Sequence, residues 1–206
     1  MKLRLKTPQL APLALIISLS VLPLACGGGG GGDGPGGVIP NGLQASFDGL
    51  PAGGGPSLSM ADFNSTDETF EVPIMVAGIS DFFGAAFRVT FNSATATFNG
   101  SSAAGSVLGS AGTNITAVLA PGTNNELIVT ATRFQGSGAT YVPSVNATNS
   151  SLLITLRFTA SETAGNTFSF GPASQREVET CDNGTETCSM MDDVDLSWTG
   201  GTMIAN

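Results

Sequence analysis

The side chains that could perform chemistry in this chain are carboxylates and cysteines, because its 206 residues contain no histidine. Without histidine the chain cannot build a Ser-His-Asp or Cys-His nucleophile site, or an HExxH zinc site. The densest acidic cluster is Asp192, Asp193 and Asp195, and oxygen-rich clusters of this kind can bind calcium. Their spacing differs from that of the EF-hand loop, so we expect no metal site and interpret the cluster as a solvated turn before the last strand, with calcium binding as the alternative.

Paired carboxylates also hydrolyse glycosides, and three glutamates precede the aspartate cluster: Glu177, Glu179 and Glu186. Nothing in the sequence places two of them on opposite sides of a cleft. A glycan-acting hydrolase therefore stays an alternative, which a cleft with paired carboxylates would favour. We expect instead a protein that is not an enzyme and that needs no cofactor.

Cys181 and Cys188 enclose a short segment that contains Asn183-Gly184, a dipeptide typical of tight turns. Such a turn brings the two sulfur atoms together, and in an exported protein the expected product is a disulfide. The alternatives are a metal site, which would lack histidine ligands, and a redox pair, which usually has Cys-x-x-Cys spacing. We therefore predict a disulfide between Cys181 and Cys188.

Residues 1–25 have the pattern of an export signal, with three basic residues among the first six and an apolar run over 10–25. The run is shorter than the roughly 20 apolar residues of a membrane-spanning helix. Its end, Leu22-Pro23-Leu24-Ala25-Cys26, resembles the lipobox of bacterial lipoproteins, in which the cysteine is acylated. We therefore expect an exported protein anchored through Cys26 in the bacterial cell envelope, at the outer membrane or cell surface. An ordinary signal peptide with a chance cysteine is the alternative.

The charge balance of the remaining chain opposes polyanionic partners. After residue 25 the chain has four arginines and no lysine, against sixteen acidic residues. Coulomb repulsion then disfavours binding to nucleic acids and to anionic lipid surfaces. We expect no nucleic-acid partner, and contact with the membrane only through the lipid.

Glycine dominates residues 26–56, beginning with an unbroken run at 27–32. Because glycine loses much entropy on ordering and has no side chain to bury, this segment is predicted to be a flexible linker. The glycine run lacks the Lys-Ser/Thr ending of a phosphate-binding loop. Residues 57–206 are predicted to form a single domain, which is long enough to bury a core of its own.

From residue 57 onward apolar residues recur with a period of two, which is typical of half-buried strands. The clearest case is Phe70, Val72, Ile74 and Val76, and the pattern returns at 87–91, 152–158, 168–170 and 194–198. No window has a sustained helical period, and turn residues separate the segments. The sequence therefore predicts an all-β, jelly-roll-like sandwich of two sheets with about nine strands. Within it, Pro73 must lie at an edge or a bulge, since proline cannot donate to a strand ladder.

The order and spacing of these segments resemble the cohesin domain across most of residues 57–206. Thr66–Ile79, which contains Val-Pro-Ile-Met-Val, is similar to the opening of a cohesin, and Phe83–Asn92 is similar to its next strand. Asn125–Ala131 and Leu152–Phe158 resemble two later strands, and Leu196–Ile204 resembles the final strand with its Gly-Gly pair. Cohesins are jelly-roll sandwiches, related in fold to carbohydrate-binding modules, that bind calcium-loaded dockerins. The resemblance implies a non-catalytic binding module.

The chain differs from the cohesin pattern on the strand that meets the dockerin. Where well-studied cohesins carry Asn and Asp, the alignment puts Gly84 and Ala86. The resemblance therefore implies the fold, with weak or no binding to standard dockerins. On the same strand Arg88 is predicted to contact the partner, because a guanidinium binds carboxylates in a bidentate way. The expected partner is a protein module, dockerin-like or unrelated, or an extracellular polysaccharide.

Sugar binding on a sandwich usually needs an exposed aromatic ring. Trp198 shares the inward phase of Val194 and Leu196, so we predict that it packs in the core. Tyr141, beside Pro143 in a loop rich in glycine and serine, is the better exposed candidate. A structural envelope component without a separable ligand is a further alternative.

Overall fold

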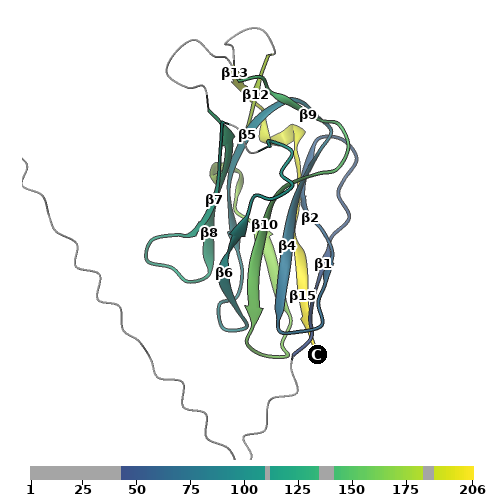
Figure 1. Ribbon diagram of the computed structural model, residues 1–206, viewed down its shortest axis with the longest axis vertical. Helices are drawn as coiled ribbons and strands as arrows, with labels where there is room; N and C mark the ends of the chain where they lie inside the picture. Colours follow the sequence, from purple (N-terminus) through teal and green to yellow (C-terminus); the bar gives the residue numbers. More distant parts are fainter. Residues whose placement is uncertain (1–42, 110–111, 135–141, 183–187) are drawn as a thin grey trace, which may run out of the picture. The chain divides into compact units, whose positions relative to one another are not determined.

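The computed structural model describes residues 43–109, 112–134, 142–182 and 188–206. In this part of the chain fifteen strands form two sheets, confirming the predicted all-β sandwich (Figure 1). Five of the strands have four residues or fewer, which is why the count exceeds the nine expected. No helix in the described residues is long and apolar enough to cross a membrane. The predicted export signal, Cys26, Tyr141 and the Asn183-Gly184 turn lie outside the described residues.

The smaller sheet has five strands in the order β14-β2-β4-β10-β6. All its pairs are antiparallel except β14 with β2, which is parallel. The bounds are β2 Ser57–Met60, β4 Thr69–Ala77, β6 Ala96–Ser102, β10 Ser151–Ala160 and β14 Ser197–Thr199.

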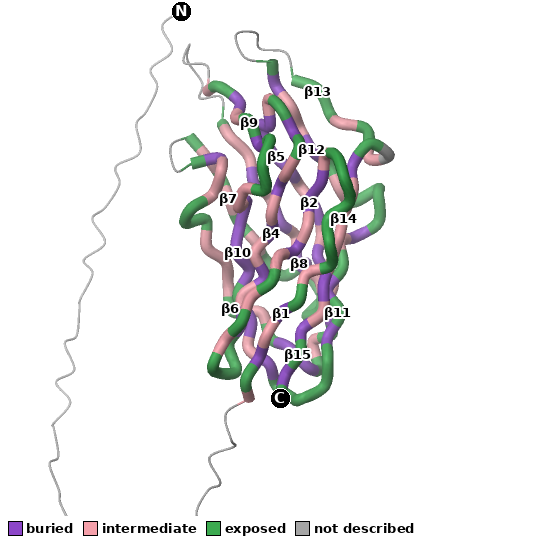
Figure 2. The backbone as a smooth tube through the Cα atoms, turned by 90° about the vertical axis from the view of Figure 1, so that its right-hand side faces the viewer, coloured by how far each residue is buried: buried purple, intermediate pink, exposed green. Residues whose placement is uncertain are grey.

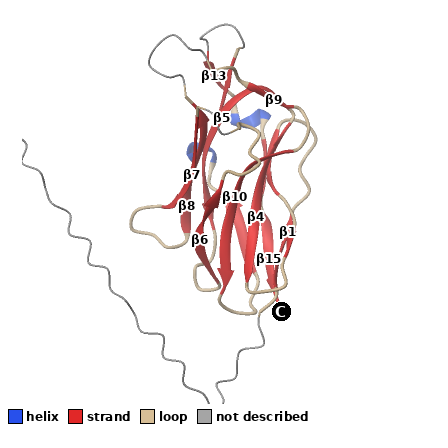
Figure 3. Ribbon diagram, in the orientation of Figure 1, coloured by secondary structure: helices blue, strands red, loops and turns tan. Residues whose placement is uncertain are grey.

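The larger sheet has ten strands and is organised around β5, which pairs with β8 and β9 along one edge and with β12 and β11 along the other. Two 3-10 helices, Ala173–Gln175 and Asp193–Asp195, connect strands and are the helices drawn in Figure 3. The strand bounds are β1 Ala45–Gly49, β3 Phe63–Asn64, β5 Ile79–Thr90, β7 Thr113–Leu119, β8 Glu126–Arg133, β9 Val145–Ala147, β11 Asn166–Phe170, β12 Arg176–Cys181, β13 Cys188–Met190 and β15 Gly201–Ala205.

The alternation predicted around residue 70 is confirmed in β4, where Phe70, Val72, Ile74 and Val76 are all buried. Pro73 lies on the same strand, which is a central one with β2 and β10 as neighbours. The ladder to β2 ends at Met60, and the next backbone N–H donates to the carbonyl of Pro73 at 2.9 Å. The prediction that Pro73 lies at an edge or a bulge is therefore wrong: it lies in a central strand, and its missing N–H is tolerated because that side of Pro73 lies just beyond the last residue pair of the ladder to β2.

In β10 the predicted alternation fails at its start, because the pairing with β4 shifts register between Leu152 and Ile154. We expected Leu152 to point inward, but Leu153 is the fully buried residue and Leu152 is half-buried. A bulge inserts an extra residue into one strand and reverses the phase of the side chains before it. From Ile154 onward Leu156 and Phe158 are buried as predicted.

Both ends of the domain differ from the prediction. Residues 45–49, expected in the linker, form β1, which pairs with β15 along its whole length. The expected final strand is two strands in different sheets, β14 and β15, and Val194 lies in a 3-10 helix instead of a strand. The chain changes sheet at Gly200, where a Cβ atom would lie 2.1 Å from the carbonyl oxygen of Phe168. Only glycine permits this close approach.

Aromatic rings from both sheets meet in the core. The ring of Phe158, on β10, lies 4.9 Å from that of Phe168 on β11 and 5.2 Å from that of Phe91, measured between centroids. Phe70 stacks on Phe158 at 5.5 Å. Pairs of this geometry each contribute about 0.5–1.5 kcal/mol beyond the burial of their area. Figure 2 shows the buried positions recurring along the strands of both layers.

Candidate binding face

Four neighbouring strands, β7, β8, β5 and β12, present one outer face of the larger sheet. On β5 the residues Ala85, Phe87 and Val89 are buried in the core. Because side chains alternate along a strand, Gly84, Ala86 and Arg88 belong to the opposite, solvent side. We call the solvent side of these four strands the β5 face.

The strand register arranges the β5 face in rows that run across the sheet. One row joins Asn114, Thr132, Gly84, Glu179 and Met190. The next row joins Thr116, Thr130, Ala86 and Glu177, and the two threonine hydroxyls lie 3.1 Å apart. A third row joins Val118, Ile128 and Arg88. The first two rows are therefore low at Gly84 and Ala86 and have larger side chains on both flanks.

The small residues at the centre form the floor of a shallow groove of about 140 Å³. Thr130 and Thr132 of β8 line one wall, and the glutamates of β12 line the other together with Met190 of β13. Met190 is 57% exposed, which makes it a prominent apolar side chain of this surface. A Cβ atom at Gly84 would lie 2.9 Å from the side chain of Thr132, so the close packing of β8 requires glycine here.

Glu177 and Glu179 lie two residues apart on β12 and share the same wall of the groove. Neither takes part in the ion pairs found among the described residues, which involve Glu71, Glu126 and Asp193. The facing wall has threonines and no carboxylate among its described lining residues. A glycosidase pair flanks the scissile bond from two sides, and this geometry does not provide that arrangement.

Arg88 lies on the β5 face as predicted, but its guanidinium has an internal partner. Its Nη1 donates to Oε2 of Glu126 on β8 at 2.7 Å, and the two side chains are 33% and 19% exposed. Glu126 was not among the predicted residues, because the pairing depends on the register between β5 and β8. A partner that binds Arg88 must share it with Glu126 or displace it.

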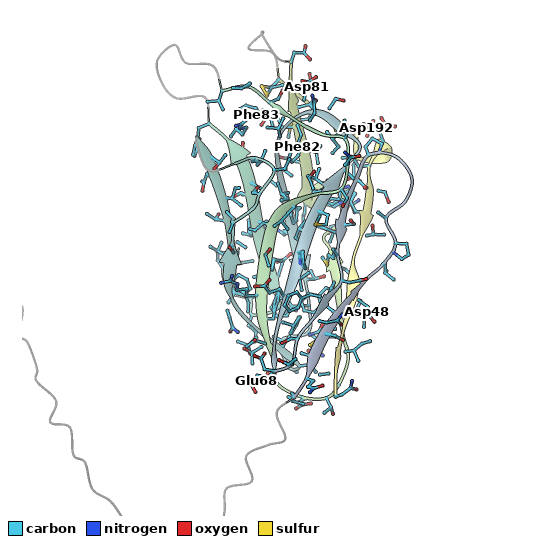
Figure 4. All side chains as sticks on the ribbon, turned by 45° about the vertical axis from the view of Figure 1, so that its right-hand side comes forward. Asp48, Glu68, Asp81, Phe82, Phe83 and Asp192 are labelled. Carbon is cyan, nitrogen blue, oxygen red and sulfur yellow. A yellow bond between two sulfur atoms is a disulfide. The ribbon has the colours of Figure 1, made fainter. Side chains whose placement is uncertain are left out.

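The three aspartates weighed as weak calcium candidates are not among the clustered ligand groups found in the described residues. Asp193 forms an ion pair with Arg176 at 2.6 Å, and Asp192 and Asp195 are exposed. Among the described residues, the group of possible ligands that lie within 4.8 Å of one another is Glu179 with the two cysteines of the disulfide. Figure 4 shows Asp192 toward the same end of the sandwich as Asp81. Asp193 and Asp195 lie in the 3-10 helix that precedes β14.

Trp198 packs against the core, as predicted. Its ring centroid lies 5.8 Å from that of Phe87 and 5.1 Å from that of Phe170. The guanidinium carbon of Arg176 lies 5.0 Å from the indole centroid, in the arrangement of a cation–π contact. Arg176 was missed by the sequence analysis, although its position two residues before the buried Val178 puts it in the inward phase. Trp198 is therefore covered and does not offer an open platform for a sugar.

The predicted disulfide is confirmed, with Cys181 and Cys188 bonded at 2.04 Å. The two residues are directly opposite each other in the β12–β13 hairpin. Cys181 is fully buried and Cys188 is exposed. The bond ties β13, and with it Met190, to the strand that carries Glu177 and Glu179.

No protein-family model and no curated protein sequence matches the chain. Solved structures of similar fold include a type II cohesin domain from the cellulosome of Acetivibrio cellulolyticus. It is 11% identical, with a TM-score of 0.45, over 69% of this chain and 96% of that domain. A cohesin module from a Clostridium perfringens family 33 glycoside hydrolase is 8% identical, with a TM-score of 0.41, over 73% of this chain and 96% of that module.

A third similar structure is the sixth cohesin of the Acetivibrio cellulolyticus scaffoldin B, solved in complex with a Cel5 dockerin. It is 16% identical, with a TM-score of 0.41, over 59% of this chain and 80% of that one. Each of these similarities is one of fold.

Proposed function

We propose that this protein is a non-catalytic binding module that holds another protein on its β5 face. The observation that carries the proposal is the groove floored by Gly84 and Ala86 between threonine and glutamate walls. A flat sheet with small central residues lets a partner's backbone approach closely, and Met190 adds an exposed apolar contact. The resemblance of residues 83–92 to the partner-facing strand of cohesins supports the same face, since this segment contains most of β5.

The charges of the face indicate the chemistry of the partner. Glu177 and Glu179 have no ion-pair partner among the described residues, and the chain has a net charge of −9. A partner with lysine or arginine beside an apolar side chain would neutralise these carboxylates and cover Met190. Charge complementarity of this kind raises association rates and excludes acidic partners. A carboxylate of the partner would bind Arg88 only by competing with Glu126.

Standard dockerins are expected to bind weakly or not at all. Gly84 and Ala86 offer no polar side-chain atoms to a ligand. Purified dockerins and a soluble polysaccharide, titrated calorimetrically into the protein, test this expectation. Tight dockerin binding would show that the two small residues do not weaken recognition.

The test of the proposed face is capture of secreted proteins from the source bacterium on the immobilised full chain. Captured proteins are identified by mass spectrometry, and a purified candidate is then titrated into the chain. The variant Glu177→Gln/Glu179→Gln keeps the shape of the groove and should weaken binding about tenfold or more. Glu71→Gln, on the other sheet, is the matched control. Equal affinity for both variants would place the partner elsewhere.

We also propose, from the sequence alone, that the module is exported and anchored in the cell envelope through Cys26. The glycine-rich segment before β1 then serves as a tether between lipid and sandwich. A structural envelope role without a ligand predicts that no secreted protein or polysaccharide is retained in the same capture experiment. Both carboxylates of the groove on the β5 face lie on one wall, and none of its other described lining residues is a carboxylate. This arrangement supports a binding role over hydrolysis.

A further inference from the structure

A second, larger hollow lies on the other sheet. It has a volume of about 350 Å³, within the range of small-molecule sites. Its walls come from strands β4, β6 and β10 of that sheet, from Phe63 of β3 at the edge of the larger sheet, and from the loop between β3 and β4. Glu68, in the loop before β4, lies at the opposite end of the sandwich from Asp192 (Figure 4). The lining side chains are Phe63, Ser65, Thr69, Glu71, Asn99 and Arg157, with two buried phenylalanines behind them.

Three polar side chains of this pocket, those of Glu71, Asn99 and Arg157, end in planar groups that are only partly used within the protein. Arg157 donates from Nε to Oε1 of Glu71 at 3.0 Å, and its side chain is 54% exposed. Among the described residues, its terminal amino groups have no other partner. Asn99 donates from its amide to the hydroxyl of Thr159, which leaves the Asn99 carbonyl oxygen as an acceptor. The pocket therefore offers hydrogen-bond donors and acceptors side by side.

A tight loop holds the rim of the pocket in place. Asp67 accepts hydrogen bonds from the hydroxyl of Thr69, from its backbone N–H at 2.7 Å, and from the hydroxyl of Ser65 at 3.0 Å. The Thr69 hydroxyl contributes most to lowering the pKa of the Asp67 carboxyl, followed by the Thr69 N–H and Ser65. Two of the pocket's lining hydroxyls are thereby oriented before any ligand arrives.

The charge around the pocket selects the class of ligand. Arg157 is compensated by Glu71, and the adjoining loop adds the carboxylates of Asp67 and Glu68. An anionic ligand would meet this negative surplus and be repelled. An uncharged ligand with many hydroxyl groups fits, because each hydroxyl both donates and accepts. The ring of Phe63 provides an apolar surface for the C–H face of such a ligand.

We propose that this pocket binds a neutral saccharide, independently of the protein partner proposed for the β5 face. The planar Arg157, Glu71 and Asn99 side chains bridge adjacent hydroxyl groups, while Phe63 packs against the ring carbons. The site differs from the predicted sugar candidates, since Trp198 is covered and Tyr141 lies outside the described residues. The module would then contact a glycan with one sheet and a protein with the other.

The test uses the detergent-solubilised full chain on an array of neutral and acidic oligosaccharides, followed by titration of bound neutral glycans. Arg157→Ala should weaken binding about tenfold, since it removes charge-assisted hydrogen bonds. Arg88→Ala is a matched control, because it removes the other Arg–Glu pair, on the opposite sheet, and should leave glycan affinity unchanged. Phe63→Ala should weaken binding without changing the preference for neutral glycans.

Hydrogen exchange of the unmodified chain with bound glycan gives a second readout that does not depend on the folding of a variant. Protection is expected in 63–71, 97–100 and 155–159. Glu177→Gln/Glu179→Gln should bind glycan normally, which separates this site from the β5 face. The proposal is wrong if no neutral glycan binds, if acidic glycans bind better, or if Arg157→Ala binds as well as Arg88→Ala.

Discussion

Reduction of the disulfide between Cys181 and Cys188 should remove a definable part of the free energy of unfolding. The bonded residues are seven positions apart, and the chain-entropy model assigns about 2.5 kcal/mol to a closed loop of this size. Domains commonly have a stability of about 5–15 kcal/mol. The aromatic core around Phe158 and Phe168 does not involve the hairpin, so the reduced protein should remain folded.

Urea unfolding followed by the fluorescence of Trp198, the single tryptophan, measures this loss in oxidised and reduced protein. The variant Cys181→Ala/Cys188→Ala should behave like the reduced form. Alanine is preferred to serine because Cys181 is fully buried, and a buried hydroxyl without a partner would add a penalty of about 1–3 kcal/mol. A loss below about 1 kcal/mol, or unfolding of the whole sandwich on reduction, would refute the reasoning.

The same reduction should weaken partner binding at the β5 face. β13 is an edge strand of the described sheet, and it pairs with β12 over only three residues, one of which is Cys188. Without the bond, β13 loses its covalent tie to the strand beside the groove, and Met190 is no longer held opposite Glu179. Glycan binding at the pocket beside β6 should not change, which distinguishes a local effect from general loss of structure.

Three further predictions concern the core, the anchor and the acid range. Phe158→Ala should lower the free energy of unfolding by about 3–5 kcal/mol in the same urea assay, while Phe134→Ala, at a side chain that is 49% exposed, should change it little. Cys26→Ala should block acylation and leave the precursor unprocessed at that site; mature-size protein that still fractionates with membranes would contradict this. The lowered pKa of Asp67 means that its contribution to stability is complete above its ordinary pKa and is lost as the pH falls through the lowered value. Asp67→Asn should remove that part of the acid dependence, which urea unfolding at several pH values measures.

The fold class could be predicted because the local alternation of apolar and polar residues specifies the strands. Alternation around Phe70 and Phe87 indicates half-buried strands without any knowledge of their neighbours. The phase error at Leu152 has a different origin, since the bulge in β10 depends on its pairing with β4. β1 was missed for a similar reason, because its short segment follows the glycine-rich stretch and becomes a strand by pairing with β15.

The candidate sites were harder to predict, because register over long separations decides which charges are paired. Arg88 and Glu126 are 38 residues apart in the sequence, and Arg157 and Glu71 are 86 apart. Each pair comes from neighbouring strands of one sheet, so no local pattern identifies it. Arg88 could be placed on the solvent side of its strand but not recognised as already paired.

The pairing registers of the two sheets also explain why the two faces of the sandwich differ in the charges that they expose. On the smaller sheet the register aligns Arg157 directly opposite Glu71 and cancels both charges inside a pocket, which favours an uncharged ligand. On the larger sheet the register aligns Glu177 with Ala86 and Glu179 with Gly84, residues that cannot neutralise a carboxylate. The carboxylates of Glu177 and Glu179 therefore keep their charge at the surface of the groove, where the basic partner proposed for the β5 face would meet them.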